Sequence, residues 1–200
     1  MQIAQIKRLQ YLDKGKRSLV FVGMLKNQCV AVKVYKTSDA TTSAKKEAYF
    51  MKLLNSKNIG PKFLSLQDDF IVYNFIRGER FSNWVNSASK EAIIFVLKKI
   101  MLQCFQLDLL KINKLEFHNP KKHILIDKNN SPVFIDFERC YFTKNPKNLT
   151  QFCQFLTSPF MQSILIKKNI NVDKKVLIKN LKLYKKNISK KTFQKIVSFF

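Results

Sequence analysis

The sequence predicts an α+β fold in which a β-rich N-terminal part precedes a mostly helical C-terminal part. Short runs of β-branched and aromatic residues, separated by turn residues, dominate the chain up to residue 76. Beyond that point apolar residues recur at helical spacing, most clearly between residues 89 and 112. We therefore expect two lobes, residues 1–76 and residues 77–200, in a chain long enough to bury a real core.

In the first lobe, five apolar runs predict an antiparallel sheet that is crossed by one helix. The helix includes residues 43–54, where Met51 and Leu54 follow Glu47 at i+4 and i+7, and it is expected to end at the Gly-Pro stop in residues 58–61. Glu47 therefore shares the core-facing side of the helix, and the alternative is a solvated charge like its lysine neighbours. The predicted strands are Leu9–Leu12, Leu19–Met24, Val30–Val34, Phe63–Leu66 and Phe70–Tyr73.

A single charged residue, Lys33, interrupts the apolar strand Val30–Val34. One interpretation is a surface lysine on an edge strand. The other is a functional lysine that a carboxylate must orient. The Glu47 carboxylate on the neighbouring helix would also need a partner, because an unpaired buried charge is costly. Glu47 is then the obvious partner of Lys33.

The second lobe is expected to begin with a short helix near Ser82–Ser87, followed by a long helix from Ser89 to Ile112. Ser89 is a preferred N-cap residue, and Glu91 lies in the first turn. The predicted core stripe of the long helix is Ile93, Leu97, Ile100, Cys104 and Leu107.

Two short apolar strands, Ile124–Ile126 and Val133–Ile135, flank a run of turn residues and predict a hairpin. Asp136 follows the second strand directly, in the segment Ile-Asp-Phe-Glu. A carboxylate at a strand end is placed to hold a metal ion against nucleotide phosphates. Lys33 and Glu47 precede it in the order that a phosphotransferase would need.

These motifs together resemble the protein-kinase-like fold. Val-Ala-Val-Lys, ending at Lys33, resembles the strand motif whose lysine contacts the α- and β-phosphates of ATP. Ile-Asp-Phe-Glu resembles the metal-binding Asp-Phe-Gly segment, and its glutamate variant is similar to RIO-type and KEOPS-complex kinases. The resemblance implies a minimal two-lobe kinase with a metal and catalytic loop at 114–140. It also implies ATP and Mg²⁺ or Mn²⁺ as cofactors, with Asp136 as a metal ligand.

The resemblance places further nucleotide contacts in the first lobe. The stretch Asn74-Phe-Ile-Arg-Gly resembles the hinge between kinase lobes, where backbone groups, here those of Asn74 and Ile76, hold the adenine ring. Gly15 lies in the turn that takes the place of the glycine-rich loop, but no G-x-G-x-x-G is present. The backbone amides of this turn could bind a phosphate, with positive charge added by Lys14, Lys16 or Arg17. The alternative is that the turn is a plain basic hairpin.

The loop before the hairpin departs from ordinary kinases. Its sequence, Glu-Phe-His-Asn-Pro-Lys-Lys-His, puts Glu116, His118 and His123 where such kinases have the His, the catalytic Asp and the metal-binding Asn. The loop resembles a divergent archaeal family of predicted serine/threonine kinases, and the match extends to residues 148–156. Overall the resemblance covers roughly residues 5–160.

His118 is the expected general base of this loop, because histidine exchanges protons near neutral pH more readily than aspartate does. Glu116 would orient its ring, and Lys121 or Lys122 would contact the γ-phosphate. His123 would bind the metal, and imidazole suits Mn²⁺ better than Mg²⁺. The alternative is that both histidines are hydrogen-bonded loop residues in a protein that binds nucleotide without transferring phosphate.

Positive charge is concentrated at the end of the chain, whose formal net charge is +24. Residues 141–200 hold 13 lysines and a single acid, Asp173. Apolar residues recur among the lysines at helical spacing, which predicts one or two amphipathic helices with a basic outer face. That face is either a solvated surface or a binding surface for RNA, an acidic partner or a membrane.

No apolar run approaches the ~20 residues that span a bilayer. The first eight residues contain no signal for secretion, and the four cysteines form no C-x-x-C pair. We therefore expect a cytoplasmic protein with free thiols and without a transmembrane segment.

Two functions from different classes fit these observations. The first is an ATP-dependent atypical kinase that phosphorylates serine or threonine on a protein substrate, itself included. The second is a catalytically weak nucleotide-binding switch or an RNA-associated ATPase. A small-molecule phosphotransferase fits less well, because the acidic substrate loops of antibiotic kinases are absent.

Overall fold

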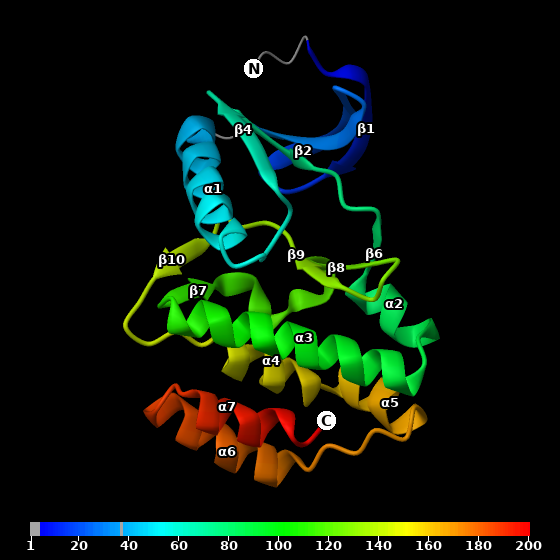
Figure 1. Cartoon of the computed structure of the whole chain (residues 1–200), viewed down its shortest axis with the longest axis vertical. Coiled ribbons are helices and arrows are strands. Elements are labelled where there is room, and N and C mark those ends of the chain that lie inside the picture. The colour runs from blue at the N-terminus through cyan, green and yellow to red at the C-terminus, as the bar shows by residue number, and fades with distance from the viewer. Residues whose placement is uncertain (1–4, 37) are drawn as a thin grey trace. The chain divides into compact units, whose positions relative to one another are not determined.

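The structure is a computed structural model that describes residues 5–36 and 38–200 (Figure 1). It contains helices and antiparallel strands, so the predicted α+β class is confirmed. Within the described residues no helix is both long and apolar enough to cross a bilayer. The sequence was expected to have no secretion signal in its first eight residues. Of these, residues 1–4 lie outside the described part of the chain.

The described residues group by their contacts into two compact units. The first unit extends to Arg77 and also takes in Val133–Arg139, and the second consists of Gly78–Pro132 and Cys140–Phe200. The predicted lobe boundary after residue 76 stays a prediction, because a grouping by contacts does not by itself define a domain.

The first unit is built on a five-stranded antiparallel sheet with the strand order β1-β2-β3-β5-β4. The predicted five strands and single helix are present. The central strand β3 is buried along most of its length, whereas every residue of the edge strand β1 is exposed. The elements are β1 (Lys7–Lys14), β2 (Ser18–Leu25), β3 (Gln28–Tyr35), α1 (Ala40–Asn55), β4 (Phe63–Gln67) and β5 (Phe70–Asn74).

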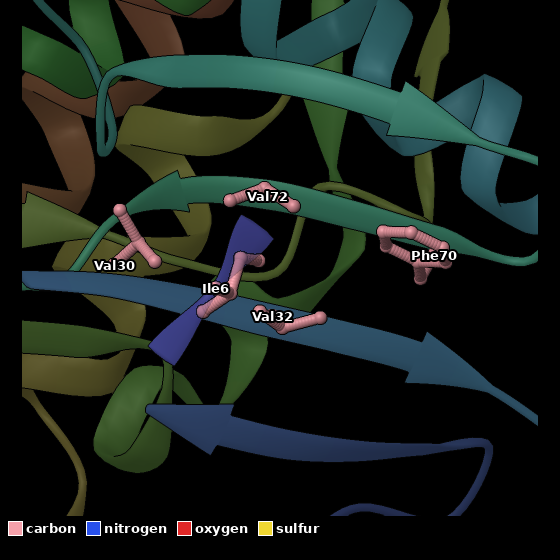
Figure 2. Close-up of a cluster of buried hydrophobic side chains, with 5 residues drawn as sticks. All are labelled: Ile6, Val30, Val32, Phe70 and Val72. Atoms are coloured by element: carbon pink, nitrogen blue, oxygen red, sulfur yellow. The ribbon is translucent and has the colours of Figure 1, made fainter. Parts of the chain in front are cut away.

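The two faces of β3 bury different side chains, because successive residues of a strand point to opposite sides. One face belongs to the apolar cluster of Figure 2, which consists of Ile6, Val30, Val32, Phe70 and Val72. The alternate residues of β3, Lys33 and Tyr35, therefore lie on the opposite face, where helix α1 packs on the sheet. This arrangement brings the polar side chains of β3 to the helix.

Helix α1 ends at Asn55, earlier than the Gly-Pro stop that the sequence predicted. The Asn55 side chain explains the earlier end, because its Nδ2 donates to the carbonyls of Ile59 (3.2 Å) and Pro61 (2.9 Å). Its Oδ1 accepts from the backbone N–H of Phe63 at 2.8 Å. These bonds satisfy backbone groups of the loop and lead the chain into β4.

The second unit is mostly helical. Its long helix begins as predicted, because Ser89 accepts a hydrogen bond from the Ala92 N–H at 3.2 Å, and the predicted core stripe is buried. It ends at Leu109, before the predicted Ile112, because Ile112 pairs with Phe142 in a short strand ladder. The elements are β6 (Gly78–Arg80), α2 (Phe81–Ser87), α3 (Lys90–Leu109), β7 (Ile112–Lys114), η2 (Leu115–His118), η3 (Pro120–Lys122), β8 (Ile124–Asp127), β10 (Cys140–Phe142), α4 (Asn148–Leu156), α5 (Pro159–Lys167), α6 (Lys174–Lys186) and α7 (Lys190–Val197). Strand β9 (Pro132–Phe134) begins at the last residue of Gly78–Pro132, and its other two residues belong to the first unit.

The predicted turn after β8 is present and is built on Asp127. Its Oδ1 accepts from the backbone N–H groups of Asn129 and Ser131 at 2.9 and 2.8 Å, a local arrangement that favours a turn. The strand that follows begins at Pro132 and ends at Phe134. Ile135 therefore lies outside this strand, although the sequence placed it inside.

The basic C-terminal segment forms the two helices α6 and α7, as the lysine pattern predicted. Within the second unit α6 and α7 lie side by side (Figure 1), and α6 also contacts α4. Phe193 of α7 stacks on Phe105 of α3 with ring centres 4.5 Å apart. Every lysine of both helices is exposed. Val176 was expected on the apolar side of these helices, but it is 38% exposed and does not belong to the core.

A buried carboxylate, Asp108, anchors three helices of the second unit. It lies on α3 and is fully buried. Its Oδ1 accepts from the backbone and side-chain nitrogens of Asn148, and its Oδ2 accepts from the Leu149 N–H and the Tyr184 hydroxyl. Burial raises the pKa of Asp108 above its ordinary 3.8, against the lowering effect of these donors.

Asp108→Asn should destabilise the protein, because an amide nitrogen would face donors that need an acceptor. We expect the free energy of unfolding to fall by about 2–4 kcal/mol at pH 7. The raised pKa means that the folded state binds this proton more tightly than the unfolded chain, so the carboxyl contributes more stability as the pH falls towards 3.8. The difference between wild type and variant should therefore widen on acidification.

Urea unfolding of both proteins at several pH values between 7 and 5 measures this difference. Asp68→Asn changes an exposed acid in the same way and should leave the free energy of unfolding almost unchanged. A difference between wild type and Asp108→Asn that shrinks on acidification would show that the pKa of Asp108 is not raised.

Candidate functional site

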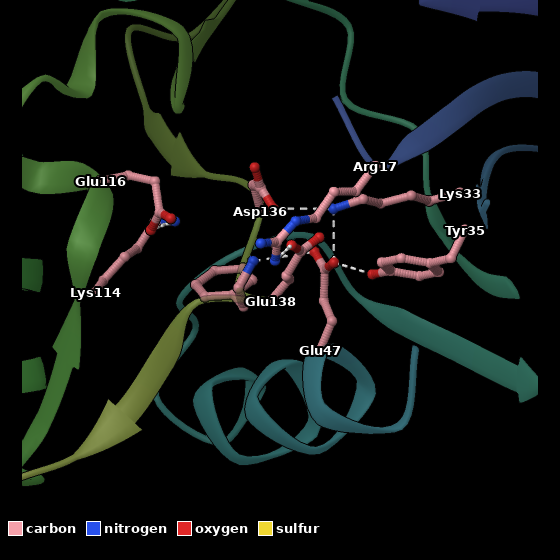
Figure 3. Close-up of polar contacts among 9 residues, drawn as sticks. Arg17, Lys33, Tyr35, Glu47, Lys114, Glu116, Asp136 and Glu138 are labelled. Carbon is pink, nitrogen blue, oxygen red and sulfur yellow. Dashed lines mark hydrogen bonds and ion pairs between the residues drawn. The ribbon is translucent and has the colours of Figure 1, made fainter. Parts of the chain in front are cut away.

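Lys33 brings a positive charge into the core of the first unit. It is 6% exposed, and its Nζ lies 2.6 Å from Glu47 Oε2 and 2.9 Å from Asp136 Oδ1 (Figure 3). Burial by itself would lower the pKa of Lys33, but the two carboxylates outweigh burial and raise it well above its ordinary value. Lys33 is therefore a charged, enclosed cation between two anions and not a solvated lysine.

Glu47 receives hydrogen bonds from three groups of the first unit. The Lys33 ammonium and the Tyr35 hydroxyl both donate to Oε2, and the Phe137 N–H donates to Oε1 at 3.0 Å. Glu47 is itself 2% exposed. Burial, and then the nearby carboxylate, raise the pKa of Tyr35, so its hydroxyl keeps its proton and acts as a donor. One carboxylate thus ties α1 to β3 and to the segment after β9.

Asp136 adopts a backbone conformation that residues other than glycine seldom take. Its φ is +68°, in the left-handed region that costs a non-glycine residue of the order of 1 kcal/mol or more. The next residue holds this bend, because the Phe137 N–H bonds to Glu47 and its ring is fully buried. Gly60, with φ +80°, makes room for that ring, since a Cβ on Gly60 would lie 2.7 Å from it. The bend presents Asp136 to Lys33 and leaves the Asp136 side chain 33% exposed.

Arg17 connects the predicted phosphate-binding turn to the Ile-Asp-Phe-Glu segment. Its Nη1 donates to Glu138 Oε1 at 2.9 Å, and Glu138 is nearly buried whereas the Arg17 side chain is 53% exposed. The Arg17 carbonyl also accepts from the Lys36 N–H at 3.0 Å. Gly15 belongs to the same turn, where its N–H donates to the Ser18 carbonyl at 2.9 Å.

Three carboxylates of the first unit converge. One oxygen from each of Glu47, Asp136 and Glu138 lies within 4.8 Å of the others. Lys33 forms ion pairs with Glu47 and Asp136, and Arg17 forms one with Glu138. Carboxylate oxygens are the ligand type that Mg²⁺ and Mn²⁺ prefer, so the donor set fits such an ion. The partly exposed Asp136 is the residue of this set best placed to reach one.

The loop residues of the second unit have different surroundings from one another. Glu116 is 4% exposed and its Oε2 accepts from the fully buried Lys114 at 3.0 Å. His118 is exposed, and its Nδ1 lies 2.6 Å from the Leu115 carbonyl oxygen. The expected orientation of the His118 ring is therefore supplied by this carbonyl, whereas Glu116 forms a buried ion pair.

The remaining loop residues lie at the surface or close to it. The Lys121 ammonium sits over the Phe160 ring, 4.0 Å from its centre, and Lys122 is exposed. His123 is half-buried, and its backbone N–H donates to the Pro120 carbonyl at 2.9 Å. Lys122 is thus the more exposed of the two candidate lysines for a phosphate contact.

His118 lines a cavity of about 370 Å³ in the second unit. Its other walls come from α4 and the two residues that follow it, and they are mainly neutral polar groups. No acidic residue is among the described residues that line it, so it suits an uncharged hydroxyl-bearing group better than a cation. The other lining residues are Gln151, Gln154, Phe155, Thr157 and Ser158.

The predicted hinge residues close one end of the sheet. The Asn74 N–H donates to the Lys62 carbonyl at 2.9 Å and the Phe75 N–H to the Cys29 carbonyl at 3.1 Å, so both N–H groups are used within the first unit. For Ile76 no such backbone bond occurs among the described residues. Ile76 is therefore the hinge residue whose backbone can serve a ligand.

Comparisons with known proteins identify the fold. No protein-family model and no curated protein matches the chain. Among solved structures that match, the kinase domain of PF14_0431 has a TM-score of 0.60 and 17% sequence identity, over 71% of this chain and 53% of that one. Since the identity is low, the likeness shows the fold alone: a two-lobe protein-kinase-like fold, as predicted. The chain spans about half the length of this neighbour.

The sequence predicted the pairing of Lys33 with Glu47 but missed three contacts around it. Tyr35 could have been found, because it lies two residues after Lys33 and so on the same face of the strand. The Phe137 N–H bond and the pairing of Arg17 with Glu138 have no local signal, because both depend on the bend at Asp136.

Tyr35→Phe should remove the hydrogen bond from the Tyr35 hydroxyl to Glu47 while keeping the aromatic ring in the core. A hydrogen bond to a charged group contributes about 1.5–3 kcal/mol, so we expect a loss of that size in the free energy of unfolding. Tyr11→Phe removes a hydroxyl from a residue that is 59% exposed and should cost almost nothing. Thermal and urea unfolding of the two variants compare them directly. Equal stability of both variants would mean that the Tyr35 hydroxyl does not hold Glu47.

Proposed function

We propose that this chain is an ATP-dependent atypical protein kinase that transfers the γ-phosphate to serine or threonine hydroxyls of a protein, itself included. The observation that carries the proposal is the placement of Lys33 between Glu47 and Asp136 on a kinase-like fold. A buried lysine and a partly exposed carboxylate beside it are the two charges that a metal-bound triphosphate needs. Membership of the RIO-like and KEOPS-like kinases belongs to the same proposal.

In this proposal the first unit binds the nucleotide. Lys33 contacts the α- and β-phosphates, and Glu47 keeps its ammonium in place. Asp136 binds Mg²⁺ or Mn²⁺, which would neutralise the phosphates of ATP. The backbone of Asn74 and Ile76 holds the adenine ring, with Ile76 contributing the N–H, and the turn that contains Gly15 supplies amides for the phosphates.

The second unit is proposed to supply the acceptor chemistry. His118 accepts the proton of the hydroxyl through Nε2, because its Nδ1 is turned towards the Leu115 carbonyl. The neutral cavity beside it supports a serine or threonine hydroxyl as the acceptor group. Lys122, or Lys121 after leaving Phe160, contacts the γ-phosphate. His123 is a second ligand of the metal, and Glu116 stabilises the loop through Lys114.

The second candidate is a nucleotide-binding switch or an RNA-associated ATPase without kinase activity. One observation favours this candidate. Residues 114–126 contain a single carboxylate, Glu116, and it is buried in an ion pair with Lys114. If His118 does not accept the hydroxyl proton, the loop has no free carboxylate that could act as the base in its place. We place either activity in the cytoplasm, since the four cysteines are free thiols.

Lys33→Ala should weaken ATP binding by about 10- to 150-fold, which corresponds to the loss of one hydrogen-bonded charge. Asp136→Ala should leave a weaker binding that no longer depends on Mg²⁺. Calorimetric titration with ATP, with and without Mg²⁺, measures both effects. Lys36→Ala removes an exposed lysine next to the same strand and should bind as wild type does. Unaltered affinity in both site variants would exclude this nucleotide site.

His118→Ala should lower the rate of phosphate transfer by about 10²–10⁴-fold, the usual contribution of a general base, with little change in ATP affinity. Glu116→Gln should cost less, because its effect on His118 is indirect. Single-turnover transfer of the γ-phosphate, with ATP affinity measured in parallel, separates the two steps. If transfer proceeds at the wild-type rate in His118→Ala, the base lies elsewhere.

A further inference from the structure

Helices α4 and α6 of the second unit enclose a groove that the proposed function does not use. The groove has a volume of about 300 Å³. Residues of α6 that line it recur at i, i+4, i+7 and i+11, from Lys174 through Ile178 and Leu181 to Lys185, and so form one face of the helix. The opposite wall is a face of α4 that begins at Thr150. The two helices contact one another within the second unit.

The floor of the groove is aliphatic. Leu177 and Leu181 are buried beneath it, and Ile178 is 41% exposed beside them. The Thr150 hydroxyl is buried at the opposite wall and has no hydrogen-bond partner among the described residues. A ligand would therefore meet apolar surface and one polar atom that lacks a partner.

The rim of the groove is basic, and the surrounding chain does not neutralise it. Lys174, Lys182 and Lys185 are exposed, and none of the three forms an ion pair with a described residue. The one acid after residue 140 is Asp173. Its Oδ1 caps α6 by accepting from the backbone N–H groups of Lys175 and Val176 at 2.8 and 3.0 Å.

The spacing of the lysines selects the size of the partner. Lys174 and Lys185 are eleven residues apart on one helix, which corresponds to about 16 Å at 1.5 Å per residue. A single small anion cannot contact both ends of such a row. A chain that carries several negative charges can, and aliphatic side chains between those charges would match the floor.

We propose that the α4–α6 groove binds an acidic amphipathic peptide segment of a partner protein. Carboxylates of the segment pair with Lys174, Lys182 and Lys185, and its leucine-like side chains cover Ile178 and the leucines beneath. Nucleic acid fits the groove less well, because single strands are bound by aromatic stacking and no aromatic or arginine side chain lines the groove. The proposal is independent of phosphate transfer.

A fluorescein-labelled 12-residue peptide of glutamates and leucines, arranged with leucines on one helical face, is the probe. Its length as a helix is about 18 Å and matches the lysine row. Fluorescence anisotropy with the full chain gives its affinity. A lysine–leucine peptide of the same pattern and a 12-nucleotide oligouridine are the comparison ligands.

The charge test compares two triple variants of α6 with the same change in charge. Lys174→Glu, Lys182→Glu and Lys185→Glu together should weaken peptide binding by about tenfold or more, since each pair contributes a fraction of a kcal/mol. Lys175→Glu, Lys179→Glu and Lys186→Glu lie on the same helix outside the groove and should weaken it by only about twofold, through the long-range field.

The apolar test compares Ile178→Ser with Leu183→Ser, since both residues are exposed on α6 and only Ile178 lines the groove. Only the first should weaken binding. The proposal would be overturned if the two triple variants lost the same peptide affinity, or if Ile178→Ser and Leu183→Ser did. Absence of peptide binding in low salt at protein concentrations up to about 1 mM would overturn it as well. Tighter binding of oligouridine that depends on the groove lysines would overturn it too and assign the surface to nucleic acid.

Discussion

The structure of the first unit depends on the buried carboxylate of Glu47. It accepts from the Lys33 ammonium, the Tyr35 hydroxyl and the Phe137 N–H, which come from different segments of the chain. Breaking a buried ion pair costs about 3–5 kcal/mol, a large part of the 5–15 kcal/mol that stabilises a typical domain. Helix position, strand and the bend at Asp136 are therefore stabilised together or lost together.

The carboxylates of Glu47 and Asp136 have different surroundings, which suit them to different roles. Both oxygens of Glu47 accept hydrogen bonds and its side chain is 2% exposed, so it is suited to orienting Lys33. The Asp136 side chain is 33% exposed and its backbone is strained, a combination that is frequent at binding sites. Arg17 offsets the added charge of Glu138. Asp136 is thereby the carboxylate from which a metal ion can be bound.

Much of this could be predicted from the sequence, because apolar spacing placed Lys33 on a strand and Glu47 on the core side of a helix. The α+β class and the long helix followed from the same periodicity. What could not be predicted depends on contacts between distant segments. The bend at Asp136 is held by a residue of α1 and by the room at Gly60, and the early end of α1 depends on the contacts of the Asn55 side chain in the following loop. The partner of Glu116 was missed because Lys114 looks like an ordinary surface lysine in the sequence.

We propose that Asp136 is required for phosphate transfer. Incubation of the protein with γ-labelled ATP and Mg²⁺ or Mn²⁺, followed by separation of phosphoprotein from free phosphate, tests this role. Asp136→Asn keeps the size of the side chain and removes its charge. We predict label in protein with the wild type and its loss in the variant. Equal labelling of both proteins, or release of free phosphate without any phosphoprotein from the wild type, would show that Asp136 does not serve phosphate transfer to protein.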